Sequence, residues 1–258
     1  IPTVPKERRI RPIHIWQSAA AILFLLLASS VYLSTVGTKA ETDLLQQYIP
    51  IAEMRSLTLP DGTKVQLNSK STLLYPQEFT GDSRSVFLLG EANFKVKPDK
   101  KRPFIVKSND LQITALGTEF NVSAYPESQE IATTLISGSI RVDYNNLTTS
   151  VILHPNEQFA YNRNNKKYDL SNPDMDDVTA WQRGELVLQK MTLTDIINVL
   201  ERKYPYAFVY SIKNLKNDRF SFRFKDNAPL EEVMEIIVNV VGQMDYRIVE
   251  DKCYLTRI

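Results

Sequence analysis

An uninterrupted apolar run near the start of the sequence constrains the chain more than any other feature. Residues 15–36, IWQSAAAILFLLLASSVYLSTV, contain no charged side chain. A helix of roughly 20 such residues matches the hydrocarbon thickness of a bilayer. A helix of this length in the core of a globular domain would be expected to show a polar face. We therefore predict a single transmembrane helix over residues 15–36.

The charges on either side of the run predict its orientation. Residues 6–11, KERRIR, carry four basic side chains and one acidic one, whereas Lys39 and Glu41, the first charges after the run, nearly cancel. The positive-inside bias then leaves residues 1–14 as a cytoplasmic stub and exports everything after Val36. This orientation predicts a single-pass protein of the inner membrane with a periplasmic C-terminus.

The run also contains candidate anchor residues. Trp16 and Tyr32 lie near its two ends, where amphipathic rings suit the headgroup level, and Leu25 and Leu26 lie near its centre.

A cleaved signal peptide is the alternative, because the small-residue ending TKA at residues 38–40 fits a cleavage site. The run is longer than the roughly 7 to 15 apolar residues of a signal-peptide core. The sequence also begins with Ile1 instead of Met, from which we expect further residues upstream. Both observations favour a retained membrane helix.

Composition and motifs argue against several functions. Lys and Arg number 31 against 30 Asp and Glu, so the basic excess of a nucleic-acid-binding protein is missing. The sequence shows no phosphate-binding glycine loop, no Cys and His cluster with metal-ligand spacing and no GxSxG elbow. The two histidines, His14 and His154, have no evident partner for a catalytic triad. We therefore expect no enzyme, no cofactor and no metal site.

The single cysteine has a structural interpretation. Cys253 cannot form an internal disulfide, and it begins the apolar alternation Cys253-Tyr254-Leu255. We predict that it is buried in a half-exposed strand.

Residues 57–168 have the pattern of an all-β domain. Short runs of alternating apolar and polar residues are separated by Gly, Pro and Asn, which is typical of strands with one buried face. The clearest predicted strands are 64–67, 85–89, 93–96, 104–106, 111–113, 120–122, 140–142 and 158–161. A loose repeat of Gly62, Gly90, Gly117 and Gly138 runs through them, and each glycine is expected to form a turn before the next strand. The spacing leaves a solenoid-like and a sandwich-like fold open.

Two polar segments flank this domain. Residues 37–56 are predicted to be a periplasmic tether from the membrane, and residues 169–180 are predicted to be a linker. Asp174, Asp176 and Asp177 suggest a metal loop as an alternative, but the segment lacks the glycine at the sharp turn and the closing glutamate of such loops.

Residues 181–258 change to a mixed α+β pattern. A strand at 184–188, a helix at 192–203 capped by Thr192 with Asp195 three residues on, and a strand at 208–210 come first. A strand at 220–224, a helix that starts near Asn227 with Pro229 in its first turn, and strands at 246–249 and 253–255 follow. The apolar helix positions recur at an offset of 37 residues, as from Leu193 to Leu230. We predict a duplicated strand-helix-strand unit whose helices cover one face of a small sheet.

An ordered set of motifs resembles a known family. LPDGTKVQLNSKSTLLYP, LLGEANFKV, RPFIVKS, ALGTEFNVSAYP, LISGSIRV and LHPNEQFAY are similar to the periplasmic domain of the FecR family of transmembrane anti-sigma regulators. AWQRGELVLQKMTLTDIINVLERKY resembles the domain that follows it in many members, which is similar to the short N-terminal domain of secretins and TonB-dependent transporters. The resemblance covers about residues 57–258 and the membrane segment.

Two departures from the family stand out. Asn156 replaces the usual glycine in LHPNEQ, but asparagine also tolerates a left-handed turn. In the family, a cytoplasmic region of some tens of residues holds the sigma factor, and here fewer than twenty residues precede the apolar run.

The resemblance implies a signalling relay. An outer-membrane TonB-dependent transporter would contact the exported region through its signalling domain, and degradation of the regulator would release an extracytoplasmic-function sigma factor for nutrient-uptake genes. The sigma factor would be held by the missing N-terminal region. An open sheet edge in the C-terminal domain suits such a contact, because it can accept a strand from a partner. The candidate edge residues are Leu186, Val187 and Leu188 in one strand and Phe220, Phe222 and Phe224 in another.

The family also suggests a self-cleavage bond. Some members are nicked at a Gly-Thr bond, which corresponds to Gly117-Thr118 in ALGTEF. A threonine hydroxyl that attacks the preceding carbonyl gives an N-to-O acyl shift, and glycine tolerates the backbone strain. The alternative is an ordinary turn glycine followed by a polar residue.

Two other functions compete with the relay. A membrane-tethered scaffold or binding module without a sigma-factor partner is the second hypothesis. An exported enzyme is the third, and it would need a cluster of ionisable residues that the sequence does not show.

Overall fold

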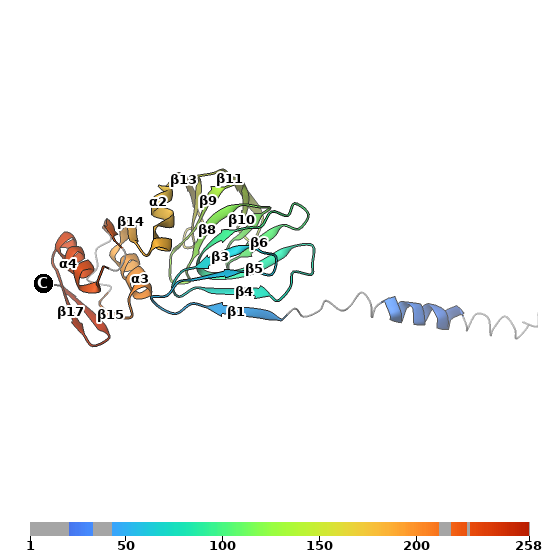
Figure 1. Cartoon of the computed structure of the whole chain (residues 1–258), viewed down its shortest axis with the longest axis horizontal. Helices are drawn as coiled ribbons and strands as arrows, with labels where there is room; N and C mark the ends of the chain where they lie inside the picture. Colours follow the sequence, from blue (N-terminus) through green and yellow to red (C-terminus); the bar gives the residue numbers. More distant parts are fainter. Residues whose placement is uncertain (1–20, 33–42, 212–217, 226–227, 258) are drawn as a thin grey trace, which may run out of the picture. The chain divides into compact units, whose positions relative to one another are not determined.

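The computed structural model describes residues 21–32, 43–211, 218–225 and 228–257 (Figure 1). The chain divides into two compact units, Ile1–Thr42 and Asp43–Ile258. In the first unit, residues 21–32 are helical and their side chains are exposed, including Leu25, Leu26 and Tyr32. Trp16 and the two ends of the predicted span lie outside the described residues.

No helix in the described part of the chain combines the length and the apolar character that a membrane crossing requires.

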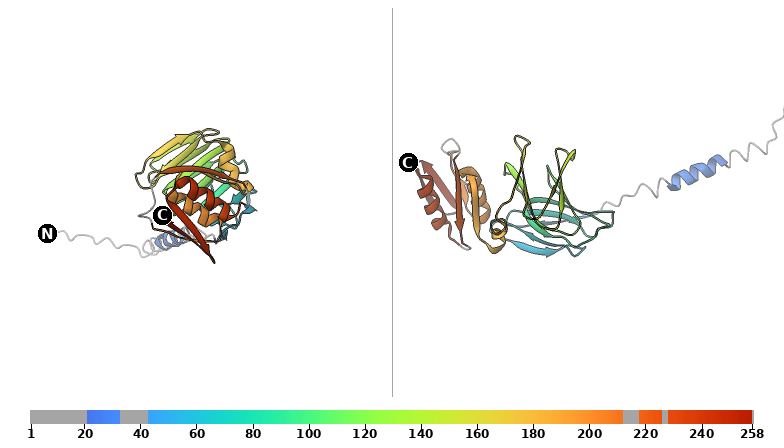
Figure 2. Two further views of the ribbon diagram at one scale, coloured as in Figure 1. Left: turned by 90° about the vertical axis from the view of Figure 1, so that its left-hand side faces the viewer. Right: turned by 90° about the horizontal axis from the view of Figure 1, so that it is seen from above.

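The second unit begins with a domain of thirteen strands that form one curled sheet, which Figure 2 shows from two further sides. We call these strands the β domain. They are β1 (Leu44–Tyr48), β2 (Arg55–Thr58), β3 (Lys64–Leu67), β4 (Thr72–Pro76), β5 (Arg84–Lys95), β6 (Phe104–Lys107), β7 (Gln112–Ala115), β8 (Glu119–Ala124), β9 (Glu130–Ser137), β10 (Ile140–Tyr144), β11 (Thr149–Leu153), β12 (Gln158–Asn162) and β13 (Tyr168–Ser171).

The long strand β5 belongs to both halves of the curled sheet. Its first half pairs with β4 and β6 in the order β1-β4-β5-β6-β7-β10-β11, and its second half pairs with β3 and β8 in the order β2-β3-β5-β8-β9-β12-β13. We call these halves sheet A and sheet B. The change of partners occurs at Gly90, where φ is +106° and an added Cβ would lie 2.7 Å from Ser71 Cα. The close approach of Ser71, which immediately precedes β4, and the positive φ both require glycine here.

This arrangement corrects the prediction of separate strands at 85–89 and 93–96. Gly90 does not end a strand, because it bends a continuous one while it passes between the two sheets. In the β domain, every pair of described strands except β5–β6 is antiparallel. A solenoid would stack parallel strands, so the sandwich-like alternative describes this domain.

The two sheets enclose one aromatic-rich core. Phe94 of β5 stacks on Phe120 of β8 with 5.4 Å between ring centroids and contacts Phe104 of β6 at 6.0 Å. All three side chains are fully buried. Burying an apolar side chain of this size stabilises the fold by about 1.5 to 3 kcal/mol. The curl of the sheet therefore brings residues from both of its halves into one cluster.

The predicted tether and linker contain regular structure. Residues 44–48 form β1, which pairs with β4, and Ile49 is fully buried. The tether prediction is therefore wrong from residue 44 onward. Within the predicted linker, β13 pairs with β12 and residues Met175–Thr179 form α2. The sequence pattern did not predict β1 and β13, because an edge strand is held by backbone hydrogen bonds and needs little alternation of apolar and polar residues.

The C-terminal module contains the predicted duplication. Its elements are β14 (Leu186–Thr192), α3 (Leu193–Lys203), β15 (Ala207–Val209), β16 (Arg219–Phe224), α4 (Leu230–Val241), β17 (Met244–Val249) and β18 (Lys252–Arg257). The apolar positions related by the offset of 37 residues are all buried, and they are Leu193, Ile196, Ile197 and Leu200 in α3 and Leu230, Val233, Met234 and Ile237 in α4. Thr192 caps α3 as predicted, since its Oγ1 accepts a hydrogen bond from the Asp195 amide.

Two details of the module differ from the prediction. The strands form two sheets, β14-β16 and β15-β18-β17, because the first strands of the two repeats pair with each other. Helix α4 starts at Leu230, so Pro229 is its N-cap and not part of its first turn; Asn227 lies outside the described residues.

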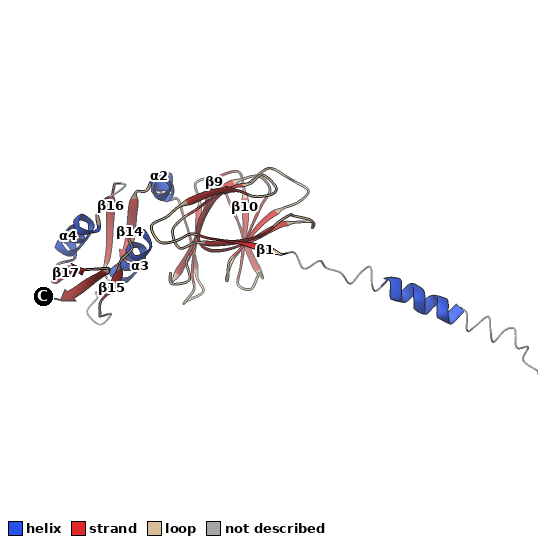
Figure 3. Cartoon of the chain, turned by 60° about the horizontal axis from the view of Figure 1, so that its bottom comes forward, coloured by secondary structure: helices blue, strands red, loops and turns tan. Residues whose placement is uncertain are grey.

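Figure 3 shows that α2, α3 and α4 all lie outside the strands of the β domain. Cys253 is buried in β18, as predicted, and burial raises the pKa of its thiol to about 11.

Candidate partner-binding site

The two strands predicted to accept a partner pair with each other. β14 and β16 are antiparallel, with Leu186 opposite Phe224 and Leu188 opposite Phe222. They form a two-stranded sheet, so in the described part of the chain each has a strand partner on one side only. Each strand therefore keeps one edge that no described strand pairs with, and such an edge is a template for strand addition.

The aromatic side chains of β16 face the core of the module. Phe220 stacks on Phe222 at 6.3 Å between ring centroids, and Phe222 stacks on Phe224 at 5.9 Å. Phe222, Phe224, Leu186 and Leu188 are buried in the same hydrophobic cluster. These residues therefore belong to the core and are not available to a partner. A partner at the edge would contact the backbone and the outward-facing side chains.

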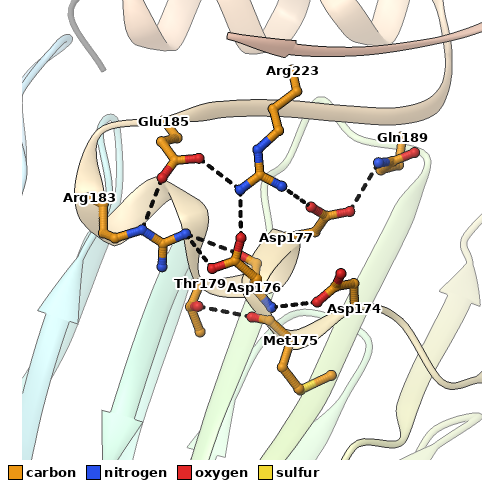
Figure 4. Close-up of polar contacts among 9 residues, drawn as sticks. All are labelled: Asp174, Met175, Asp176, Asp177, Thr179, Arg183, Glu185, Gln189 and Arg223. Carbon is orange, nitrogen blue, oxygen red and sulfur yellow. Dashed lines mark hydrogen bonds and ion pairs between the residues drawn. The ribbon is translucent and has the colours of Figure 1, made fainter. Parts of the chain in front are cut away.

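An ion-pair network covers the outward face of β16, and Figure 4 shows its members. Arg223 Nη1 lies 2.6 Å from Asp177 Oδ1, and Arg223 Nη2 lies 2.6 Å from Asp176 Oδ2 and 2.8 Å from Glu185 Oε2. Arg183 completes the network at 2.7 Å from Asp176 and 3.0 Å from Glu185. Hydrogen bonds from the two guanidinium groups lower the pKa of Asp176 and of Glu185, and the hydrogen bonds of Arg223 to these two carboxylates raise its own pKa. The network fastens α2 and the 3-10 turn η1 (Ala180–Arg183) to β16.

Asp174, Asp176 and Asp177, the residues considered for a metal loop, are all engaged in hydrogen bonds or ion pairs. Asp174 Oδ1 accepts a hydrogen bond from the Asp176 amide and so caps α2, and Asp177 Oδ2 accepts one from Gln189 of β14. Among the described residues, no group of three or more His, Cys, Asp or Glu side chains could hold a metal ion. The acidic run therefore serves as a helix cap and an ion-pair partner. The sequence analysis missed this role, because Arg223 lies 46 residues beyond Asp177 in the chain.

A groove of about 1,090 Å³ runs along β14. Its lining includes Val187 and Gln189 from β14 and, from the outer face of sheet B, Asn121, Thr134 and Gln158. β14, one of the two strands with an open edge, therefore lines a groove whose opposite wall consists of polar side chains of the β domain.

A polar cluster lies at one end of this groove. Glu91 Oε1 accepts a hydrogen bond from Asn121 Nδ2 at 3.0 Å, and Glu91 Oε2 accepts one from Asn68 Nδ2 at 2.8 Å. Trp181 Nε1 donates to Asn121 Oδ1 at 3.3 Å. Burial raises the pKa of Glu91, and the two accepted hydrogen bonds oppose that shift. The cluster joins η1 to the outer face of sheet B.

Arg202 makes the tightest contact between the module and the β domain. Its guanidinium lies 3.8 Å from the ring centroid of Tyr125, and its Nη1 lies 2.6 Å from Glu127 Oε1. The Ala52 amide donates to the Arg202 carbonyl at 3.0 Å, and the Tyr125 hydroxyl donates to the Ser69 carbonyl. Nothing in the sequence distinguishes Arg202 from Lys203 beside it, so pattern analysis could not find this contact.

The predicted self-cleavage bond lies inside the β domain. Gly117 has φ +152°, and an added Cβ would lie 2.9 Å from Pro98 Cα. Thr118 is 7% exposed, and its Oγ1 is buried with no hydrogen-bond partner among the described residues. Backbone hydrogen bonds hold both sides of the bond, from the Asp99 amide to the Leu116 carbonyl and from the Val96 amide to the Thr118 carbonyl. Gly117 is exposed and Thr118 is buried, so this bond lies at the margin of the β domain core, whereas the candidate edge strands contribute to the core of the C-terminal module.

Comparisons with known proteins agree with this two-core arrangement. The family model described as "FecR protein" matches residues 49–141, and the one described as "FecR, C-terminal" matches residues 185–255. Two crystal structures of "a putative anti-sigma factor" from Parabacteroides distasonis ATCC 8503, at 2.50 and 1.65 Å, are each similar to this chain with a TM-score of 0.78 and 34% sequence identity. The matches cover 84% of this chain and 100% of the first structure, and 83% and 99% for the second. No curated protein sequence matches this chain.

Proposed function

This chain belongs to the FecR family of anti-sigma factors, and on that basis we propose that it relays a periplasmic signal from an outer-membrane TonB-dependent transporter to an extracytoplasmic-function sigma factor. Residues 15–36 anchor it in the inner membrane with a cytoplasmic N-terminus and a periplasmic C-terminus. The sigma factor is held on the cytoplasmic side of that segment, and its release controls the transcription of nutrient-uptake genes.

The open edges of the two-stranded sheet β14-β16 carry the proposal for the transporter contact. The signalling domain of the transporter adds a strand to one of them, with affinity from main-chain hydrogen bonds. Because the phenylalanines of β16 face inward, specificity comes from outward residues such as Val187, Ser221 and Arg223. The ion pairs of Arg223 hold β16 against α2 and Glu185, so the edge is preorganised for binding.

Hydrogen exchange during binding tests the proposal. Residues 43–258 form one compact unit. The first similar crystal structure is matched over 100% of its own length and covers 84% of this chain, so a fragment with these bounds is suitable for solution experiments. We would titrate it with the isolated signalling domain of a TonB-dependent transporter encoded beside this gene. We expect saturable binding and slower amide exchange in β14 or β16.

Two results would count against this function. Slower exchange confined to other strands would reject the β14-β16 edges as the contact. A lack of binding at high micromolar concentration would favour the alternative function, a membrane-tethered scaffold or binding module without a sigma-factor partner.

We further propose that the chain cleaves itself between Gly117 and Thr118. The Thr118 hydroxyl, which has no hydrogen-bond partner among the described residues and lies beside a glycine with positive φ, supports this proposal. The hydroxyl oxygen attacks the Gly117 carbonyl carbon and forms an ester bond as the peptide C–N bond breaks, and the hydroxyl proton passes to the Thr118 nitrogen, which becomes a free amine. Water then hydrolyses the resulting ester.

Mass spectrometry of the purified chain tests the cleavage. We expect two fragments that separate at this bond, and Thr118→Ser should retain them whereas Thr118→Ala should abolish them. Thr133→Ala is the matched control, because Thr133 is also buried with an unpaired hydroxyl. An intact wild-type chain, or cleavage of Thr118→Ala, would refute the proposal.

A further inference from the structure

The outer face of sheet A contains an apolar hollow that the relay does not use. Its volume is about 390 Å³, which lies within the range of small-molecule sites. Leu74 of β4 and Phe87 and Leu89 of β5 supply its apolar wall, and the buried Leu88 and Leu111 also belong to its lining. Phe87 and Leu89 remain 41% and 40% exposed, although their strand is central in the sheet. An apolar surface of this kind on a central strand indicates a ligand site.

A strained turn completes the hollow. Leu147 lies in the hairpin between β10 and β11 and lines the hollow, and its own side chain is 56% exposed. Asn145, Asn146 and Leu147 all have positive φ, with values of 51°, 55° and 64°. Asparagine adopts this conformation readily, but leucine is strained in it. The Tyr161 hydroxyl donates to Asn145 Oδ1 and holds the turn in place.

The strained backbone conformation of Leu147 is not offset by stabilisation of the fold, because its exposed side chain buries little apolar surface. Asparagine or glycine at this position would satisfy the backbone at lower energy. Strain retained at an exposed position is a sign of function. We therefore infer that the Leu147 side chain serves to make an apolar contact with a ligand in the hollow.

One cation lies at the rim. Lys107 ends β6, directly opposite Phe87 of β5, and its Nζ lies 5.4 Å from the Phe87 ring centroid. In the described part of the chain, no carboxylate forms an ion pair with Lys107, while Asp110, the acidic residue of the lining, is paired with Arg163 and Lys166. The rim therefore presents a net positive charge beside an apolar interior.

From this geometry we propose that the hollow binds a small amphipathic anion, with an aliphatic or aromatic body between Phe87, Leu89 and Leu147 and a carboxylate or sulfonate head at Lys107. The apolar body displaces water from the wall, and the head forms a charge-assisted contact with the ammonium group. This ligand site is separate from the β14-β16 edges, and it does not depend on the relay.

Calorimetric titration of the fragment 43–258 with decanoate and with decanol tests the site. Decanoate should bind saturably and more tightly than decanol, because only decanoate carries a negative head. Lys107→Gln should remove that difference and leave decanol binding unchanged. Leu147→Asn should weaken both ligands by about tenfold, since one large apolar contact is lost.

Leu147→Asn has a second expected effect that distinguishes a site from a structural contact. Because asparagine tolerates positive φ, the variant should melt about 2 °C or more above the wild type while it binds more weakly. Ile152→Asn is the matched control, since Ile152 is 60% exposed on β11 and does not line the hollow. It should leave binding of both ligands unchanged.

Three results would overturn the proposal. Wild-type affinity in Leu147→Asn would show that the leucine does not contact the ligand. Equal weakening by Ile152→Asn would show unspecific adsorption to the sheet. No saturable binding of either probe would exclude a small amphiphile and leave a side chain of a partner protein as the occupant.

Discussion

A buried ion pair joins two loops of the β domain to its longest strand. Arg84 at the start of β5 and Asp61 are 1% and 3% exposed, and Arg84 Nη1 lies 2.6 Å from Asp61 Oδ2. Arg84 also donates hydrogen bonds to the Lys97 and Arg102 carbonyls. One guanidinium group thus satisfies acceptors from both loops in a site from which water is excluded.

Removal of the acidic partner should be costly. Asp61→Ala leaves the Arg84 charge buried without its counter-ion, so we expect a loss of about 3 to 5 kcal/mol in the free energy of unfolding. Urea unfolding of the fragment 43–258 measures it. Glu119→Ala, which breaks the exposed pair with Lys95, is the control and should cost about 1 kcal/mol or less. Equal losses in the two variants would show that the Asp61 carboxylate does not stabilise the fold.

Single residues differed in how well the sequence predicted them. The burial of Cys253 and the positive φ of Gly117 followed from local patterns, because alternation and turn chemistry are properties of neighbouring residues. The Arg84–Asp61 pair did not, because its members are separated by 23 residues and a lone arginine at the start of a strand is usually exposed. The strain at Leu147 was equally invisible, since nothing in the sequence requires a leucine to adopt positive φ.

At the level of elements, acid should loosen the attachment of α2 to β16. The Arg223 network lowers the pKa of Asp176 below 3.8 and that of Glu185 below 4.5, their ordinary values. Since the folded-state pKa is the lower one, the contribution of these groups to stability is full above the ordinary values. It is lost as the pH falls through the lowered values.

Urea unfolding at several pH values checks this sign. Arg223→Gln should be less stable than the wild type at pH 7, and the difference should shrink as the pH falls below about 4. Arg247→Gln, which removes a cation over the Tyr254 ring, should show a difference that does not depend on pH in this range. A difference between Arg223→Gln and the wild type that stays constant with pH would mean that the network does not hold these carboxylates ionised.

Periodicity predicted many of the elements that bury apolar side chains, although β4 and β9, which bury Leu73, Ile131 and Leu135, were not among the predicted strands. Helices α3 and α4 and most strands of the β domain were expected because each buries one face, and burial at every second or every third to fourth residue marks the sequence. β1, β13 and α2 were missed because backbone hydrogen bonds and ion pairs hold them. The two-sheet arrangement of the module was also missed, since strand pairing depends on contacts between the two repeats.

In the unit as a whole, Arg202 connects the two hydrophobic cores. It lies near the end of α3, and α3 follows β14 directly, so one continuous segment leads from the candidate partner site to Tyr125 and Glu127 of the β domain. A partner strand on β14 would therefore be connected through α3 and Arg202 to the β domain, which follows the predicted membrane segment in the sequence. For the proposed relay, this contact is the place where the two domains are mechanically coupled.

Differential scanning calorimetry of the fragment 43–258 tests that coupling. The wild type should unfold in one cooperative transition. Arg202→Met keeps the apolar stem but removes the cation–π contact and the ion pair, which together contribute about 2 kcal/mol. We expect the transition to start about 4 to 8 °C lower and to separate into two, one for each core. Arg247→Met removes a cation within the C-terminal module alone and should preserve a single transition. If Arg202→Met also unfolds in one transition at the wild-type temperature, the cores are coupled elsewhere, and the Trp181–Asn121 hydrogen bond becomes the contact to remove next.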